Sequence, residues 1–206
     1  MEKEHTKSGS RTLLLSVLMS APGPLVMGLG LMAGRSATQI ADFVRRSAEL
    51  LAIVASYAVY RITTREGRCD ATRREKLERG SNAFVGAMMC LGGAFMLLLA
   101  FMSGQGDKGN VIPGLVIALL GVIANTAFFV KYTRLNRKQP NAILLVQSRL
   151  YRAKSLVDGC VSIALIAVWL FPGSGAAYVL DMAGSAIVAL YLVWCGMKTI
   201  REAKGR

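Results

Sequence analysis

Apolar residues are grouped along the chain into six stretches, each long enough to cross a membrane as a helix. The hydrocarbon core of a bilayer is about 30 Å thick, and about 20 helical residues span it. The stretches are residues 12–33, 37–60, 82–103, 111–132, 155–172 and 176–197. The pattern therefore predicts an all-α polytopic membrane protein, a six-transmembrane-helix bundle that forms a single transmembrane domain over residues 1–206. We expect no soluble C-terminal domain, because only nine residues follow Met197.

Four charged residues interrupt this apolar pattern. Arg45 and Glu49 belong to the second stretch, and Lys154 and Asp158 belong to the fifth or directly precede it; the members of each pair are one helical turn apart. A charge at the centre of a membrane helix costs about 2.5 to 3.5 kcal/mol on insertion scales. Such charges are retained when they pair with one another or line a wet cavity.

Polar side chains extend both pairs into stripes at helical spacing. The stripe of the second stretch consists of Asp42, Arg45, Arg46, Glu49 and Ser56. The stripe of the fifth consists of Tyr151, Lys154, Asp158 and Ser162. Since charged edges avoid lipid, we expect the two stripes to face each other.

Two interpretations of these stripes stay open from the sequence. In the first, the charges form structural ion pairs, either along each helix (Arg45 with Glu49, Lys154 with Asp158) or across the two helices. In the second, Asp42, Glu49 and Asp158 are oxygen ligands or proton carriers on a cation path. The two are not exclusive.

Composition and charge agree with a membrane protein. Hydrophobic residues make up 53% of the 206 residues, and the mean hydropathy is +0.44. The net charge of +13 comes from 25 Lys and Arg residues, most of which lie in the N-terminal tail, between Arg61 and Arg79, between Lys131 and Lys154, and after Met197. The positive-inside rule then predicts that both termini and both long connections are cytoplasmic. The expected partner of this charge is the headgroup layer of the lipid bilayer and not a nucleic acid.

Sequence motifs exclude several other functions. The four cysteines are scattered singly and form no Cys-x-x-Cys pattern. No Walker-A loop, dinucleotide fingerprint, His-Glu-x-x-His or Gly-x-Ser-x-Gly element is present, so the sequence predicts no enzyme and no bound cofactor. We interpret Gly92, Gly93, Gly121 and Gly184 as packing positions. Asn125 and Thr126 either reach the charged cluster or form a bond between helices.

The order and spacing of these motifs resemble the transmembrane domain of the cation diffusion facilitator (cation efflux) family. The run Ala41-Asp42-Phe43-Val44-Arg45-Arg46-Ser47-Ala48-Glu49 resembles the family signature of helix two, Ala-Asp-x-x-His/Asp-x-x-x-Asp. Lys154-Ser155-Leu156-Val157-Asp158 is similar to the His-x-x-x-Asp of helix five, and Asp181-Met182-Ala183-Gly184-Ser185 to the Asp-x-x-x-Ser of helix six. The resemblance covers nearly the whole chain.

The metal site that this resemblance implies is degenerate. Family members bind a divalent metal through four side chains with lone pairs, two from helix two and two from helix five, which suits tetrahedral zinc. Here Arg45 and Lys154 stand at two of these positions, so only Glu49 and Asp158 are left as metal ligands. An arginine has no acceptor, and a lysine binds metal only after losing its proton. The transport-site positions are thus Asp42, Arg45, Glu49, Lys154 and Asp158.

Two functions follow from the resemblance. The first is a cation-efflux-like transporter with altered metal ligands, which carries a divalent metal ion as its substrate or is coupled to protons. The second is a non-transporting partner or regulatory subunit whose buried pairs of Arg or Lys with carboxylates are structural. In either case we expect an integral protein of a bacterial inner membrane that forms a homodimer, or a heterodimer with a related membrane protein.

Overall fold

The computed structural model describes residues 2–33, 37–64, 70–102, 112–170 and 175–205, with only the backbone described in some helical turns. Seven α-helices and no strand occur within these ranges. They are α1 (Glu2–Ser20), α2 (Pro22–Ala33), α3 (Ala37–Thr63), α4 (Ala71–Met102), α5 (Ile112–Lys138), α6 (Ala142–Leu170) and α7 (Gly175–Gly205). The prediction of an all-α bundle is confirmed.

The first predicted helix, residues 12–33, is divided into α1 and α2. Helix α1 already begins at Glu2 and ends at Ser20, and the last hydrogen bond of this turn joins the Ala21 amide to the Val17 carbonyl at 2.9 Å. Pro22 has no N–H for the next bond, and its ring clashes with the carbonyl four residues earlier. It does, however, fit the first position of a new helix, where α2 begins. The prediction of one continuous helix is therefore wrong at Ala21.

Helix α6 begins well before the predicted start at residue 155. Asn141 caps its N-terminus, because its Oδ1 accepts hydrogen bonds from the amides of Ile143 (2.9 Å) and Leu144 (3.3 Å). Helix α4 likewise begins at Ala71 and not at residue 82. A hydropathy pattern indicates only the apolar part of a helix, which lies in the lipid. It does not indicate the polar turns by which the same helix continues beyond the bilayer.

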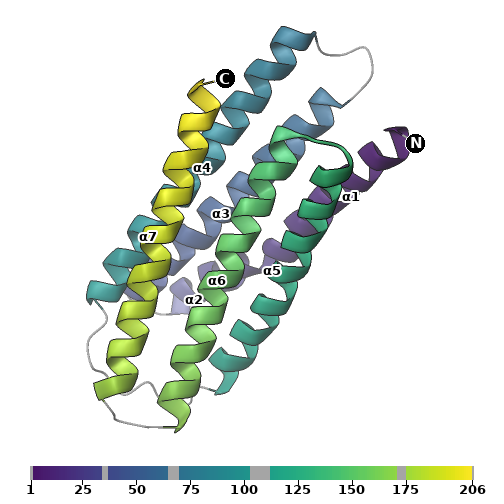
Figure 1. Ribbon diagram of the computed structural model, residues 1–206. Coiled ribbons are helices and arrows are strands. Elements are labelled where there is room, and N and C mark those ends of the chain that lie inside the picture. The colour runs from purple at the N-terminus through teal and green to yellow at the C-terminus, as the bar shows by residue number, and fades with distance from the viewer. Residues whose placement is uncertain (1, 34–36, 65–69, 103–111, 171–174, 206) are drawn as a thin grey trace.

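The long helices run side by side along one direction (Figure 1). The beginning of α1, the end of α7, the end of α3 and the turn between α5 and α6 lie at one end of the bundle. Helix α4 packs closely on α7, because a Cβ atom added to Gly86 would lie 2.7 Å from the Gly196 carbonyl oxygen, and one at Gly93 would lie 2.8 Å from that of Ala189. Gly93 is therefore a packing position, as the sequence predicts.

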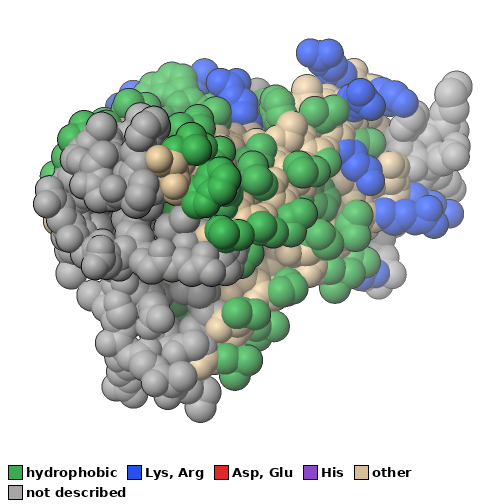
Figure 2. All heavy atoms as spheres, turned by 90° about the horizontal axis from the view of Figure 1, so that it is seen from below, with side chains coloured by type: hydrophobic (Ala, Val, Ile, Leu, Met, Phe, Trp, Pro, Cys, Tyr) green, Lys and Arg blue, Asp and Glu red, His purple; other side chains and the backbone are tan. Residues whose placement is uncertain are grey.

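The outer surface of the bundle is apolar. Leu25, Ile123 and Ile187 are each 67% exposed. In the view of Figure 2, hydrophobic side chains cover the flank of the bundle, while Lys and Arg side chains gather toward one end. Three helical segments within the described residues are long and apolar enough to cross a membrane: Ala71–Leu98, Leu115–Lys138 and Met182–Gly205.

Candidate functional site

The charged stripe of α3 lies inside the bundle. Nη1 of Arg45 lies 3.2 Å from Oε1 of Glu49, one helical turn along the same helix. The two side chains are only 13% and 11% exposed. Burial at this level makes the pair energetically important, because a charge that has left water needs a partner.

Helix α6 adds a second cation to the same carboxylate. Nζ of Lys154 lies 3.3 Å from Oε2 of Glu49, and it also lies over the ring of Tyr151 at 5.1 Å from the ring centroid. Each oxygen of Glu49 therefore has its own cation, Arg45 along the helix and Lys154 across the helices. The sequence left open whether ion pairs form along each helix or across the two helices. The structure has one pair along α3, Arg45 with Glu49, and one pair across α3 and α6, Lys154 with Glu49.

Asp158 is held by a different helix. Nδ2 of Asn125 on α5 donates a hydrogen bond to Oδ2 of Asp158 at 2.6 Å. The carboxylate lies directly against α5, since a Cβ atom at Gly121 would lie 2.5 Å from Oδ2. Among the residues that the structure describes, Asp158 forms no ion pair with Lys154 or Arg45. Gly121 is thus more than a helix packing position, because it makes room for this side chain.

These charges line one cavity of about 430 Å³ in the interior of the bundle. Helices α3, α5 and α6 supply its charged and polar walls. The break between α1 and α2 supplies Ser20, Gly23 and Pro24. Nothing in the sequence indicates this contribution, because the first apolar stretch contains no charge that would mark it as part of a site.

Other members of the predicted stripes have separate roles. Arg46 lines the cavity with Arg45. Ser56 is fully buried and accepts a hydrogen bond from Nε2 of Gln147 at 2.7 Å, which joins α3 to α6 two turns away from Glu49. The hydroxyl of Ser162 donates to the backbone carbonyl of Asp158. Asp42 belongs to α3, but its side chain lies outside the described part of the chain.

Hydroxyl groups join α1 to the helices around the cavity. The Ser16 hydroxyl lies 2.8 Å from the Tyr132 hydroxyl, and the Ser20 hydroxyl lies 3.4 Å from that of Tyr151. The rings of Tyr132 and Tyr151 stack with their centroids 5.5 Å apart. The Lys154 ammonium over Tyr151 thus belongs to a network that reaches three helices. Ser16, Ser20 and Tyr132 lie outside the two polar stripes, so the sequence does not predict them as part of the site.

The cavity does not offer the donors of an ordinary zinc site. Arg45 and Lys154 occupy the space beside Glu49 and supply protons where a metal requires lone pairs. The described residues contain no group of three or more His, Cys, Asp or Glu side chains placed to hold a metal ion. Among the described residues, Asp158 forms a hydrogen bond with Asn125 but no ion pair, although Arg45 and Lys154 line the same cavity.

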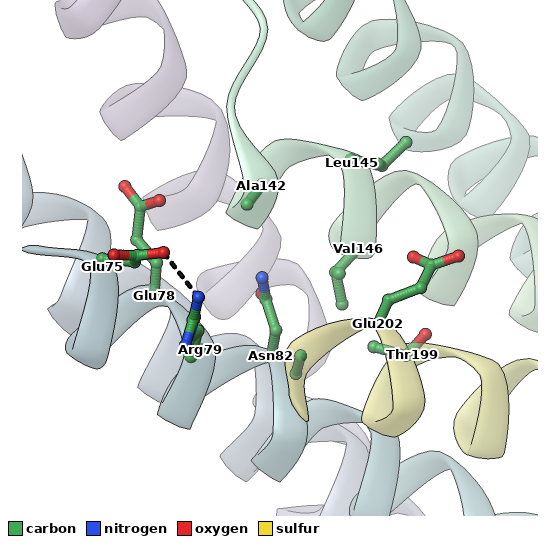
Figure 3. A pocket seen from close by; sticks show the side chains of 10 residues that line it. Glu75, Glu78, Arg79, Asn82, Ala142, Leu145, Val146, Thr199 and Glu202 are labelled. Atoms are coloured by element: carbon green, nitrogen blue, oxygen red, sulfur yellow. Dashed lines mark hydrogen bonds and ion pairs between the residues drawn. The ribbon is translucent and has the colours of Figure 1, made fainter. Parts of the chain in front are cut away.

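A second pocket of about 240 Å³ lies where α4, α6 and α7 meet (Figure 3). It is lined by Glu75, Glu78, Glu202 and Arg79 together with neutral residues. All three carboxylates are paired with arginines: Glu75 with Arg79 at 2.6 Å, Glu78 with Arg74 at 3.0 Å, and Glu202 with Arg149 at 2.6 Å. These pairs are more exposed than those of the cavity, so this pocket is the weaker candidate for a transport site.

The comparisons with known proteins agree with the geometry. A family model described as the cation efflux transmembrane domain matches residues 13–204 of the chain. No curated protein matches the chain significantly.

Proposed function

Because the chain belongs to the cation efflux family, we propose that this integral membrane protein is a cation transporter with altered ligands, whose interior cavity is the transport site. One observation carries the proposal. The Asp158 carboxylate lines the cavity and, among the described residues, has a hydrogen bond from Asn125 but no ion pair. A carboxylate that lines a cavity in a membrane protein and is not held in an ion pair is suited to bind a cation in transit.

The proposal assigns different tasks to the five transport-site positions. Asp158 binds the transported cation, whereas Glu49 is neutralised by Arg45 and Lys154 and keeps the walls of the cavity together. Asp42, near the beginning of α3, stays a transport-site position on the evidence of the sequence alone. Coupling to protons belongs to the proposal, because a carboxylate that releases a cation on one side of the membrane can take up a proton there.

Orientation follows from the distribution of positive charge. We propose that the protein lies in a bacterial inner membrane with both termini on the cytoplasmic side. The gathering of Lys and Arg toward one end of the bundle supports this orientation (Figure 2).

Transport into liposomes tests the proposed function. The purified protein is reconstituted with a pH-sensitive dye inside, and sodium, potassium, magnesium, manganese and zinc are each added outside. We expect wild-type protein to move at least one cation and the Asp158→Asn variant to move none. The matched control is Glu75→Gln, which also neutralises one carboxylate, but at the exposed pocket. Equal flux in wild type and Asp158→Asn, or no flux above empty liposomes, would contradict the proposal.

One observation favours a second function, that of a non-transporting partner subunit. Arg45 and Lys154 occupy ligand positions and satisfy Glu49 without any ion. In this case the protein forms a heterodimer with a family member whose metal site is intact. Co-expression with an intact family member from the same genome separates the two functions. Co-purification of the two chains, with zinc flux that needs both, would establish the partner function and leave this chain inactive alone.

A further inference from the structure

A third pocket, of about 380 Å³, lies between the beginning of α1 and the end of α5 and is lined mainly by cations. Both of these helix ends lie at the same end of the bundle (Figure 1). The described lining consists of Ser8, Leu135 and four cations, which we call the α5 cluster: Lys131, Arg134, Arg137 and Lys138. Within the described residues, no side chain of the α5 cluster forms an ion pair or a hydrogen bond. No described carboxylate therefore balances the charge of this pocket.

The sequence places no acid on α5 or on the first half of α6. Between Asp107 and Asp158 the chain contains no Asp or Glu at all. Elsewhere in the structure, Arg74, Arg79 and Arg149 each pair with a glutamate. Like charges three or four residues apart on one helix repel each other, as they do in the α5 cluster. An anion from outside the protein would therefore stabilise this cluster.

The dipole of α5 accounts for only part of the α5 cluster. Cations in the last turn of a helix interact favourably with the negative end of its dipole. Arg137 and Lys138 belong to the last turn of α5. Lys131 and Arg134 precede that turn, and the effect of the dipole falls off within it. These two cations need a different partner.

Lys131 and Arg134 continue the exposed apolar side of α5. Eleven residues make about three helical turns, so Leu120 lies on the same side of α5 as Lys131, and Ile123 on the same side as Arg134. Leu120 is 61% exposed and Ile123 is 67% exposed. Eleven residues also rise about 16 Å along the helix, close to the hydrocarbon thickness of one leaflet. A phospholipid along α5 would thus place its acyl chains on these apolar side chains and its phosphate at the cations.

Helix α1 forms the other wall of the pocket in the same way. Ser8 lines the pocket, and Leu15 and Met19 lie about two and three turns further along the same side of α1. Leu15 is 45% exposed and Met19 is 60% exposed. The hydroxyls of Ser16 and Tyr132, 2.8 Å apart, hold α1 against α5. The two helices thus offer apolar side chains along their length and cations at one end, which matches the polarity of a phospholipid.

We propose that the pocket between α1 and α5 binds the headgroup of an anionic phospholipid, with the α5 cluster around its phosphate. Arginine binds phosphate through two parallel N–H bonds, and lysine binds it as a point charge. Basic pockets between membrane helices recognise lipid headgroups of this kind. A lipid with two phosphates, such as cardiolipin, balances more of the four charges than a lipid with one. The inference does not rest on the proposed transport function, because it requires only that the apolar helices lie in a bilayer.

Lipid titration followed by native mass spectrometry tests the inference. Full-length protein, freed of co-purified lipid in a neutral detergent, is titrated with cardiolipin, phosphatidylglycerol or phosphatidylcholine of matched acyl chains, and the bound lipids are counted. We expect a single cardiolipin molecule to bind most tightly, phosphatidylglycerol to bind more weakly, and phosphatidylcholine to show no preferred site. Higher salt should weaken the binding of both anionic lipids, because the cations are exposed.

Variants locate the headgroup. Lys131→Gln/Arg134→Gln should weaken cardiolipin binding about thirtyfold, since each cation near a membrane surface contributes about a factor of five. The matched control is Arg73→Gln/Lys76→Gln, which removes one arginine and one lysine at the same spacing from exposed positions of α4 outside the pocket. This control should bind as the wild type does. Ser8→Leu changes no charge but fills the pocket from α1, and it should weaken binding about tenfold.

Several outcomes would overturn the inference. These are equal retention of cardiolipin and phosphatidylcholine, binding that survives Lys131→Gln/Arg134→Gln or Ser8→Leu, and an equal loss in the α4 control. Displacement of the lipid by millimolar inorganic phosphate or by an RNA oligonucleotide would assign the pocket to a soluble ligand instead. The side chains of Glu2 and Glu4 lie outside the described residues. If only Glu2→Gln/Glu4→Gln binds cardiolipin, the N-terminal turn of the protein itself neutralises the α5 cluster, and the lipid site is wrong.

Discussion

The interior cavity and the pocket between α4, α6 and α7 are built from the same chemical groups but differ in burial. In both, an arginine and a glutamate one helical turn apart form an ion pair: Arg45 with Glu49 at 3.2 Å inside, Arg79 with Glu75 at 2.6 Å outside. The side chains are 13% and 11% exposed in the first pair and 36% and 59% exposed in the second.

Distance alone would rank these pairs in the wrong order. The exposed pair is shorter, yet water stabilises its separated charges almost as well, so its net contribution is small. The buried pair has no such alternative, because each charge depends on the others after leaving water. Four changes test this comparison, beginning with the largest expected effect.

Glu49→Ala should destabilise the protein most. It leaves Arg45 and Lys154 buried without their shared carboxylate, and breaking a buried pair costs about 3 to 5 kcal/mol. The measurement is thermal unfolding in detergent. The double variant Glu49→Ala/Lys154→Ala should recover part of the loss, because one stranded cation is removed with its partner. If the single variant unfolds at the wild-type temperature, the cavity is well hydrated and the comparison fails.

Replacing the two cationic side chains by metal-binding side chains should convert the cavity into a zinc site. Arg45→Asp with Lys154→His restores four lone-pair donors, and we expect zinc affinity to rise about a hundredfold, near 3 kcal/mol. Calorimetry on wild type and variant measures the gain. Tight zinc binding by the wild type that survives loss of both Glu49 and Asp158 would show that these residues do not govern metal affinity.

Asp158→Ala should have an intermediate effect on stability. It removes one charge-assisted hydrogen bond from Asn125, worth about 1.5 to 3 kcal/mol, and strands no ion-paired cation. Thermal unfolding of Asp158→Ala and Glu49→Ala under the same conditions shows which variant loses more stability. A loss for Asp158→Ala that equals or exceeds the loss for Glu49→Ala would mean that Asp158 neutralises the cations and that the assignment of both to Glu49 is wrong.

Glu75→Gln should leave the stability of the protein nearly unchanged. An exposed pair contributes about 0 to 1 kcal/mol, and salt screens part of that. Unfolding at low and high ionic strength should give almost the same temperature for wild type and variant. A clear loss that disappears at high salt would assign this pocket a larger electrostatic role than its exposure indicates.

The sequence predicts the charged edges well because helical periodicity places residues on a face without tertiary information. Arg45, Glu49, Lys154 and Asp158 meet around one cavity as their spacing indicates. Which charges pair inside the cluster depends on how each helix is rotated about its own axis. Helical periodicity does not indicate this rotation. Glu49 therefore takes both cations, a combination the sequence leaves open.

Two further features of the site are missed by the pattern of apolar residues. Gly121 is one of several glycines in apolar stretches, and only the approach of α6 reveals that its missing side chain makes room for Asp158. Pro22 does carry a signal for a helix break, but the apolar run through it is long enough to hide that signal. The resulting break then brings Ser20 and Gly23 to the cavity.

The charges of α3 and α6 also bear on how the chain enters the membrane. Arg45, Arg46 and Glu49 lie close together in α3, and charges of this kind disfavour the insertion of a helix on its own. Helix α3 is synthesised long before α6, so Glu49 enters without Lys154. We therefore expect α3 to remain at the edge of the translocation machinery, or at the headgroup layer, until α6 emerges. The contact between Glu49 and Lys154 would then complete membrane insertion as well as the cavity, and biogenesis would depend on the same side chains as transport.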